Sequence, residues 1–411
     1  MTTLFDPHAI RPLFPALQQE VAARPAVFFD GPGGTQVPQT VIDAISGYLA
    51  HSNANTHGAF ATSVRTDATI AAAHAAMADL LGCSPSETVF GANMTTLTFA
   101  VSRAIGRELG PGDEIVVTQL DHDANVAPWR ALAERGVTIR EVAVDVEDCT
   151  LDLADLATQI TPRTRLVAIG YASNAVGTIN PVRHVVELAH QVGALAYVDA
   201  VHYAPHGPID VQALDCDFLA CSVYKFFGPH VGVLYGKAEH LARFTPYKVR
   251  PAADTGPERW MTGTQNHACL AGTTAAIEYL ASLAPNAPDR RSALLTAMTT
   301  IQDYERALSE QLIAGLLRIP GLTFYGIREP ERFAQRTPTV SIRLAQHSPR
   351  ATAEALAARG IFAWDGNYYA LSLSERLGVE PIGGMVRIGL AHYNTPAEVD
   401  YLLEVLDALA R

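Results

Sequence analysis

The sequence predicts an α/β fold, with a mostly parallel sheet in a large domain and a small α+β domain behind it. Apolar runs of strand length alternate with helical patterns through the first two-thirds of the chain. This alternation is typical of a parallel sheet covered by helices on both faces. The pattern changes near residue 283, where Ala284-Pro-Asn-Ala-Pro288 marks a boundary. With 411 residues, 48% of them hydrophobic, the chain can bury the cores of two domains.

The elements of the first part follow from short aliphatic runs and from helical periodicity between them. We expect strands at Glu114–Thr118, Thr138–Ala143, Arg165–Gly170, Ala194–Val198, Phe218–Ser222 and Gly232–Tyr235. We expect helices at Thr69–Leu81, Thr95–Leu109, Ala124–Arg135, Leu153–Gln159 and Val182–Val192. Gly193 directly after the last of these is a typical residue to end a helix.

After the boundary near residue 283, the sequence predicts a helix, two strands, a helix, a strand and a helix, in that order. The ranges are about Arg291–Leu317, Gly321–Gly326, Thr339–Arg343, Arg350–Arg359, Met385–Leu390 and Pro396–Arg411. This order indicates a small α+β unit. We therefore expect an N-terminal arm associated with the small domain at 1–24, a large domain at 25–284 and the small domain at 285–411.

Composition and charge exclude several classes of function. The net charge is −12 and no basic cluster stands out, so we expect neither a nucleic-acid nor an anionic-membrane partner. Five dispersed cysteines without CxxC pairs are typical of reduced thiols. The start of the chain lacks the pattern of a signal peptide and no run reaches the ~20 apolar residues of a membrane span. These features predict a cytoplasmic protein, and no histidine spacing indicates a metal site.

Lys225 is the most informative residue, because it stands just past the apolar run Phe218–Cys221 and precedes the glycine-rich turn Gly228–Gly232. A lysine there loses solvation unless the protein uses it, although a surface lysine is the plainer interpretation. The run Ala194–Val198 ends in Asp199. A lysine and an aspartate at the ends of neighbouring buried strands indicate a pyridoxal phosphate (PLP) site. The lysine would hold the cofactor as a Schiff base and the aspartate would hold its ring nitrogen.

Polar residues follow other predicted strands, and each group also has a plainer interpretation. The loop Gly91–Thr96 opens a helix and offers N–H groups and hydroxyls to a phosphate. His122 follows a strand end, yet it fits a surface or capping role, and Ser173–Gly177 fits a turn. Asp199 fits a helix cap, and His202 and Tyr224 fit the core. Their convergence at the carboxyl ends of strands favours a site, since open α/β sheets bind ligands there.

These residues resemble the class V aminotransferase family, on its cysteine desulfurase branch, over nearly the whole chain. The most specific stretches are Asp121–Asn125, Ser173–Gly177, Asp199–His202, Ser222–Lys225, Gly263–Asn266 and Arg387–Asn394. The resemblance implies a fold type I PLP-dependent transferase with a seven-stranded-type sheet, and PLP as cofactor. The chain is most similar to the subgroup called cysteine desulfurase-like proteins.

The resemblance also implies a role for each matching residue. Lys225 would carry the cofactor and move protons, Asp199 would pair with the ring nitrogen, and His122 would stack on the ring. His202 stands in the place of a glutamine that bonds the ring oxygen. The phosphate would be held by Met94 (through its backbone), Thr95, Ser222 and Tyr224, and by Thr264 of a second subunit, which implies a homodimer with shared sites. Arg387, helped by Asn174, would clamp the substrate carboxylate, and the side-chain end of the substrate would meet Asn55, His57 and Tyr369.

One departure from the family pattern bears on the reaction. Tyr369 stands where group II desulfurases carry the sulfur-accepting cysteine, and Trp364 stands in place of an arginine. A phenol cannot form a persulfide, so we expect no desulfurase activity through this position. Cys221 or Cys269 remains available as a thiol placed elsewhere in the sequence.

We expect a PLP enzyme acting on an amino acid, either a lyase that eliminates a β-substituent by C–S cleavage or an aminotransferase. A true desulfurase, an epimerase and an inactive PLP-fold binding protein remain alternatives.

Overall fold

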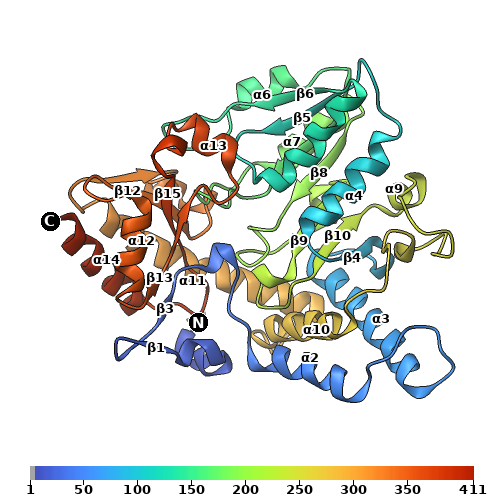
Figure 1. The fold of residues 1–411 in the computed structure, drawn as a ribbon, viewed down its shortest axis with the longest axis horizontal. Coiled ribbons are helices and arrows are strands. Elements are labelled where there is room, and N and C mark those ends of the chain that lie inside the picture. Colours follow the sequence, from blue (N-terminus) through green and yellow to red (C-terminus); the bar gives the residue numbers. More distant parts are fainter. Residues whose placement is uncertain (1–4) are drawn as a thin grey trace.

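A computed structural model of the chain describes residues 5–411 (Figure 1). Its large sheet has seven strands in the order β4-β10-β9-β8-β7-β5-β6. Their bounds are β4 Thr88–Gly91, β5 Glu114–Thr118, β6 Thr138–Val142, β7 Thr164–Gly170, β8 Leu195–Asp199, β9 Phe218–Ser222 and β10 Gly232–Gly236. Strands β6, β5, β7, β8 and β9 are parallel, and β10 runs antiparallel between β9 and β4. The predicted α/β fold with a mostly parallel sheet is confirmed.

Helices cover both faces of this sheet, because its strands are apolar on both sides. One core lies on the face covered by α4 and α5 and includes Leu97, Val117 and Tyr197. The other lies on the face covered by α7 and α10 and includes Val185 and Val198. The longer helices of the large domain are α2 Gln39–His51, α3 Ala61–Leu81, α4 Met94–Gly106, α6 Leu153–Gln159, α7 Val182–Gln191, α9 Ala238–Arg243 and α10 His267–Ser282. Three helices have four residues each: α5 Ala127–Arg130 and α8 Val211–Leu214 in the large domain, and α1 Pro7–Ile10 before it.

The small unit is built on a four-stranded antiparallel sheet, β11-β12-β15-β14. Its strands are β11 Leu322–Tyr325, β12 Thr339–Leu344, β14 Trp364–Gly366 and β15 Met385–Gly389, and its helices are α11 Arg290–Leu316, α12 Pro349–Ala357, α13 Leu371–Arg376 and α14 Pro396–Ala410. Near the N-terminus, β1 Glu20–Val21 pairs with β2 Arg24–Pro25, and β3 Val27–Phe28 pairs with β13 Ile361–Phe362. Residues 27 and 28 therefore contact the small unit, while the limits of the arm and of the two domains stay a prediction.

The single helix predicted over 124–135 is wrong. The structure has two 3₁₀ turns there, with only α5 between them. Pro128 lacks an N–H and is tolerated only in the first turn of a helix, so it ends the preceding turn and starts a new one. The irregular path matters for the site, because it begins at His122.

Within residues 5–411, none of the helices has both the length and the apolar character that crossing a bilayer requires.

Candidate active site

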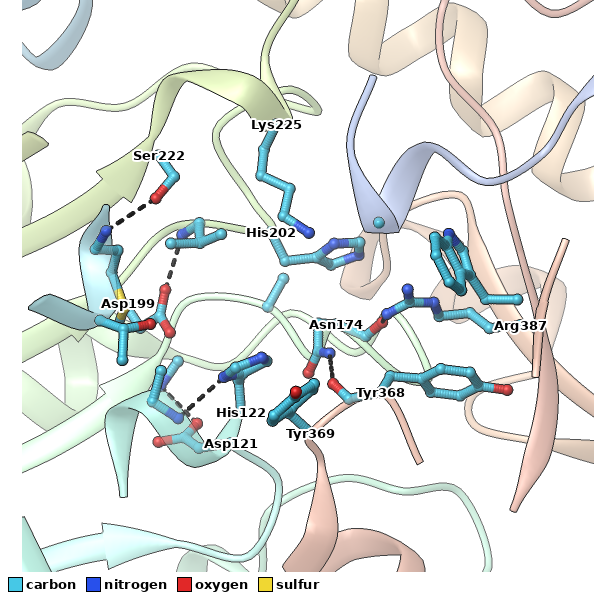
Figure 2. A pocket seen from close by; sticks show the side chains of 18 of the residues that line it. Asp121, His122, Asn174, Asp199, His202, Ser222, Lys225, Tyr368, Tyr369 and Arg387 are labelled. Carbon is cyan, nitrogen blue, oxygen red and sulfur yellow. Dashed lines mark hydrogen bonds between the residues drawn. The ribbon is translucent and has the colours of Figure 1, made fainter. Parts of the chain in front are cut away.

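A cavity of about 470 Å³ lies where the carboxyl ends of the large-sheet strands meet the small unit (Figure 2). Most of the residues predicted for the site line it. They are Met94, Thr95, His122, Asn174, Asp199, His202, Ser222, Tyr224, Lys225, Tyr369 and Arg387. The parallel strands β5, β7, β8 and β9 each deliver a residue from the loop that follows their last position, while Tyr369 and Arg387 come from the small unit.

Lys225 lies in a 3₁₀ turn directly after β9, and its side chain points into the cavity. Its ammonium donates a hydrogen bond to the carbonyl oxygen of Pro32. Burial, aided by the positive charge of Arg387 and opposed by Asp199, lowers the pKa of Lys225 to about 7. In a large fraction of the molecules, the side chain is therefore an uncharged amine near neutral pH, and this is the form that attacks a carbonyl.

Asp199 is the last residue of β8 and is only 7% exposed. Its Oδ1 accepts a hydrogen bond from the N–H of Val201 at 2.9 Å. Burial raises the pKa of Asp199 to about 6, against the opposing effects of the Val201 N–H and of Lys225. A cationic partner beside this buried carboxylate would hold it ionised.

His122 presents a neutral aromatic face to the cavity. Its Nδ1 accepts the N–H of Ala124 at 3.0 Å, and burial, aided by Lys225 and Arg387, lowers its pKa to about 4. On one side the ring stacks on Tyr369, with centroids 5.5 Å apart and planes at 17°. The backbone N–H of Asp123 also donates to the carbonyl of Tyr369 at 2.7 Å. The two rings lie one against the other at the cavity wall (Figure 2).

The N-terminus of α4 forms another wall. Asn93 caps the helix by accepting the N–H of Thr96 at 2.9 Å, and the N–H of Met94 donates to Ser222 Oγ at 3.0 Å. Gly232 permits this approach of the loop to β10, since a Cβ there would lie 2.3 Å from the Asn93 backbone. First-turn N–H groups and the hydroxyls of Thr95 and Ser222 make this end of the cavity suited to an anion.

Arg387, on β15, is the cation at the opposite end of the cavity. It is 5% exposed and its Nη1 donates to the Asn174 carbonyl at 2.9 Å. Its Nε and the Asn174 Oδ1 are buried without a hydrogen-bond partner among the described residues. The guanidinium lies 4.3 Å from the centre of the Tyr368 ring. Burial lowers the pKa of Arg387 to about 10, so the side chain remains charged at neutral pH.

These groups fit PLP. The cofactor needs an amine, a carboxylate for its ring nitrogen, donors for its phosphate and a planar partner for its ring. Lys225, Asp199, the start of α4 and His122 supply these four features around one cavity. The unpartnered Arg387 Nε beyond them suits a carboxylate.

Three predicted residues lie elsewhere in the chain. Thr264, Asn55 and His57 line a separate surface pocket, together with Val249 and Met261. Within a single chain they do not reach the cavity around Lys225.

The structure adds residues for which the sequence analysis assigned no role. Asp121 lines the cavity, accepts the N–H of Gly170 at 2.7 Å, and burial raises its pKa to about 8. The turn at Gly31–Gly33 carries the Pro32 carbonyl that meets Lys225. A Cβ on Gly33 would lie 2.2 Å from Trp364 Nε1, so the indole packs here only against a glycine. Asp121 could have been found, because it belongs to the stretch Asp121–Asn125 that carries the family resemblance. The contact of Pro32 with Lys225 joins residues 193 positions apart, so no local sequence pattern indicates it.

None of the five cysteines lines the cavity. Cys221 is fully buried, and burial raises the pKa of its thiol. Cys269 lies in α10 and burial raises its pKa as well. Over residues 5–411, no group of three or more histidine, cysteine and acidic side chains is arranged to hold a metal ion.

Comparison with known proteins places the chain in a family. A probable cysteine desulfurase of Mycolicibacterium paratuberculosis is 34% identical over 99% of this chain, and a cysteine desulfurase of Synechococcus elongatus is 37% identical over 97%. The chain spans 58% and 63% of the length of these two relatives. The apo structure of a cysteine desulfurase from Thermococcus onnurineus superposes with a TM-score of 0.89 at 28% identity, covering 100% of this chain and 99% of the other. Residues 27–402 match the family model of aminotransferase class V, so the chain belongs to this family of PLP-dependent enzymes.

Proposed function

We propose that this enzyme eliminates a β-substituent from an amino acid, by C–S cleavage in the preferred case, with PLP held on Lys225. The observation that carries the proposal is the cavity itself: it joins Lys225 and Arg387 and contains no cysteine. As a cysteine desulfurase-like PLP enzyme, the protein acts on an amino acid. The type of bond it breaks is our inference.

PLP supplies an electron-accepting ring that weakens the bonds at the α-carbon of an attached amino acid. Asp199 would hold the ring nitrogen protonated, and His122 would cover one face of the ring. The start of α4 and Ser222 would hold the phosphate. Each of these side chains lines the cavity and is held by its own hydrogen bonds before any ligand arrives.

Arg387 would bind the carboxylate of the substrate. Its Nε has no partner among the described residues, and Asn174 Oδ1 beside it is free to accept the substrate ammonium or another donor. A carboxylate fixed by a buried guanidinium is retained, which disfavours decarboxylation. Proton removal from the α-carbon is then the favoured first step.

Lys225 is the base that we assign to that step. With a pKa lowered to about 7, its Nζ exists in part as a free amine at neutral pH and accepts a proton readily. The same nitrogen can return the proton to a leaving group or to the α-carbon. Which atom of the substrate or cofactor receives the proton decides between elimination, transamination and epimerisation.

We further propose that the chain is not a persulfide-forming desulfurase. Tyr369, which stands where the family resemblance puts the sulfur-accepting cysteine, lines the cavity, and Cys221 is fully buried. A buried thiol with a raised pKa is a poor nucleophile.

The test is a product assay with purified protein, PLP and a panel of amino acids that includes cysteine, cysteine sulfinate and cysteine conjugates. Pyruvate with equimolar ammonia supports elimination. A 2-oxo acid without ammonia indicates an aminotransferase, and loss of optical activity alone indicates an epimerase; either outcome would refute the elimination proposal. Mass spectrometry after cysteine turnover checks each cysteine, and a persulfide on Cys221 or Cys269 would show a desulfurase. Lys225→Ala is the control, expected to lose the borohydride-trapped lysine adduct.

A further inference from the structure

His202 lines the cavity and is 4% exposed. Its ring and the amino end of Lys225 point into the same part of the cavity (Figure 2). The Nε2 of His202 lies 3.1 Å from the hydroxyl of Thr337, a residue of the small unit just before β12. No role has so far been assigned to Thr337.

The hydroxyl of Thr337 decides which nitrogen of His202 carries the proton. Thr337 Oγ1 donates to the carbonyl of Gly177 at 3.2 Å. A hydroxyl has a single proton to donate, so towards His202 the oxygen can only accept. The hydrogen bond therefore runs from Nε2–H of His202 to Thr337. In a neutral imidazole this leaves Nδ1 without a proton, as a hydrogen-bond acceptor.

The surroundings keep His202 neutral. Burial, aided by the charges of Arg387 and Lys225 in the same cavity, lowers the pKa of His202 below its usual value. Two carboxylates lie near it and each has another partner. Glu305 is bonded to His206, with Nδ1 and Oε2 2.7 Å apart, and Asp199, which lines the same cavity, accepts the N–H of Val201. The rings of His206 and His202 lie 5.3 Å apart, so a charged His206 would also oppose a charged His202. No carboxylate bonds to His202 itself in the described part of the chain.

We propose that Thr337 is a positioning residue that fixes His202 as a hydrogen-bond acceptor for the ring hydroxyl of the cofactor. PLP carries this hydroxyl on the carbon beside the one that bonds a lysine, so a side chain next to Lys225 Nζ meets it. An acceptor there keeps the proton on the cofactor oxygen, whereas a donor would favour its loss. The proposal rests on the PLP function above, and it places a small-domain residue in control of a proton in the large domain.

The first experiment reads the tautomer in the cofactor-free protein, by NMR of ¹⁵N-labelled histidine. The His202 signal is the one lost in His202→Gln. We expect a protonated Nε2 and a bare Nδ1 between about pH 6 and pH 8. Thr337→Val should change this pattern, and Thr337→Ser, which keeps the hydroxyl, should restore it. A proton on Nδ1 in the wild type, or an unchanged pattern in Thr337→Val, would overturn the proposal.

The second experiment follows the absorbance of bound PLP against pH. His202→Gln can turn an amide donor towards the cofactor and should lower the titration midpoint by about one pH unit. Ser309→Ala, at a buried serine of α11 that does not line the cavity, should leave the midpoint unchanged. An identical midpoint in His202→Gln would overturn the contact with the cofactor. A wild-type chain that binds no PLP would instead refute the proposed function, and the acceptor role with it, whichever tautomer the NMR reads.

Discussion

At the scale of single residues, Arg387 carries the clearest prediction about the substrate. Arg387→Lys keeps the positive charge but loses the planar pair of donors. Loss of one or two charge-assisted hydrogen bonds should lower kcat/KM about 10- to 100-fold, mainly through a higher KM. Arg350→Lys, in an exposed ion pair on α12, is the matched control and should change neither constant. A wild-type KM in Arg387→Lys would show that the carboxylate binds elsewhere.

Lys225 predicts how cofactor loading depends on pH. Only the free amine reacts, and burial lowers the pKa of this amine to about 7. The rate of PLP binding to the cofactor-free protein should therefore rise with pH and level off above about pH 7, rather than continue to rise towards the usual lysine value. Asp199 raises this pKa, so Asp199→Asn should move the midpoint to lower pH. Stopped-flow absorbance measures the rate, and a rate still rising at pH 9 would contradict the assignment.

At the scale of elements, the cap of α4 should serve both stability and ligand binding. Asn93→Ala removes the acceptor for the Thr96 N–H and should cost about 1 kcal/mol of unfolding free energy. Asp289→Ala removes a similar cap from α11, at Ser292, and should cost about the same. Of the two variants, only Asn93→Ala should weaken PLP binding, because α4 lines the cavity and α11 does not. Equal PLP affinity in the two variants would show that the N-terminus of α4 does not bind the phosphate.

At the scale of the whole molecule, we propose that a second copy completes the site. Thr264, Asn55 and His57 line a surface pocket next to Val249, which is 61% exposed. A charge at an apolar contact is costly to bury, so Val249→Asp should raise the dimer dissociation constant at least about tenfold.

Light scattering measures the molar mass, which should fall from that of a dimer towards that of a monomer in Val249→Asp. The affinity for PLP should fall together with the molar mass. Val146→Asp, at a valine that is 45% exposed and outside this pocket, is the control. A wild-type chain that remains a monomer at all accessible concentrations would refute the shared site.

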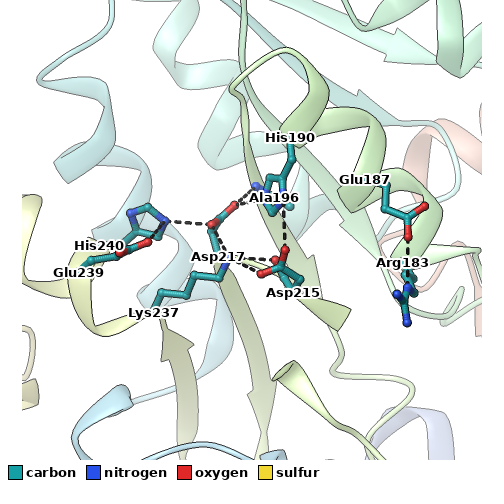
Figure 3. Close-up of polar contacts among 9 residues, drawn as sticks. All are labelled: Arg183, Glu187, His190, Ala196, Asp215, Asp217, Lys237, Glu239 and His240. Atoms are coloured by element: carbon teal, nitrogen blue, oxygen red, sulfur yellow. Dashed lines mark hydrogen bonds and ion pairs between the residues drawn. The ribbon is translucent and has the colours of Figure 1, made fainter. Parts of the chain in front are cut away.

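A buried carboxylate at the opposite end of the sheet predicts the acid stability of the fold (Figure 3). Burial alone would raise the pKa of Asp217, but hydrogen bonds from His240, Ala196 N and His190, with the charge of Lys237, hold it well below its usual range. Because the folded pKa is lowered, this stabilisation is present above the ordinary pKa of 3.8 and is lost as pH falls below it.

Asp217→Asn should therefore lower the unfolding free energy at neutral pH by about 3 kcal/mol and flatten its dependence on acid. Asp407→Asn, in an exposed pair with Arg411, should change it by less than about 0.5 kcal/mol. Urea unfolding at several pH values measures both. Equal losses in the two variants would contradict the role of the buried cluster.

Much of the fold was predictable because its signals are local. Buried parallel strands read as aliphatic runs, and helix ends carry glycine or capping residues. The same locality explains the candidate site. Asp199 directly follows such a run, Lys225 stands just past another, and the carboxyl ends of parallel strands meet at one edge of the sheet. At Pro128 the helical periodicity continues while the proline itself interrupts a helix, and the helix predicted over 124–135 was wrong.

The sequence by itself therefore determined most strands of the large sheet, the candidate lysine and aspartate, and the family resemblance. Only the tertiary structure decided which groups surround them. Lys225 meets the Pro32 carbonyl 193 residues away, and His202 meets Thr337 135 residues away. It also decided that Thr264 lies apart from the cavity within one chain. Such contacts depend on how two units pack together, and no periodicity or local propensity of either segment encodes them.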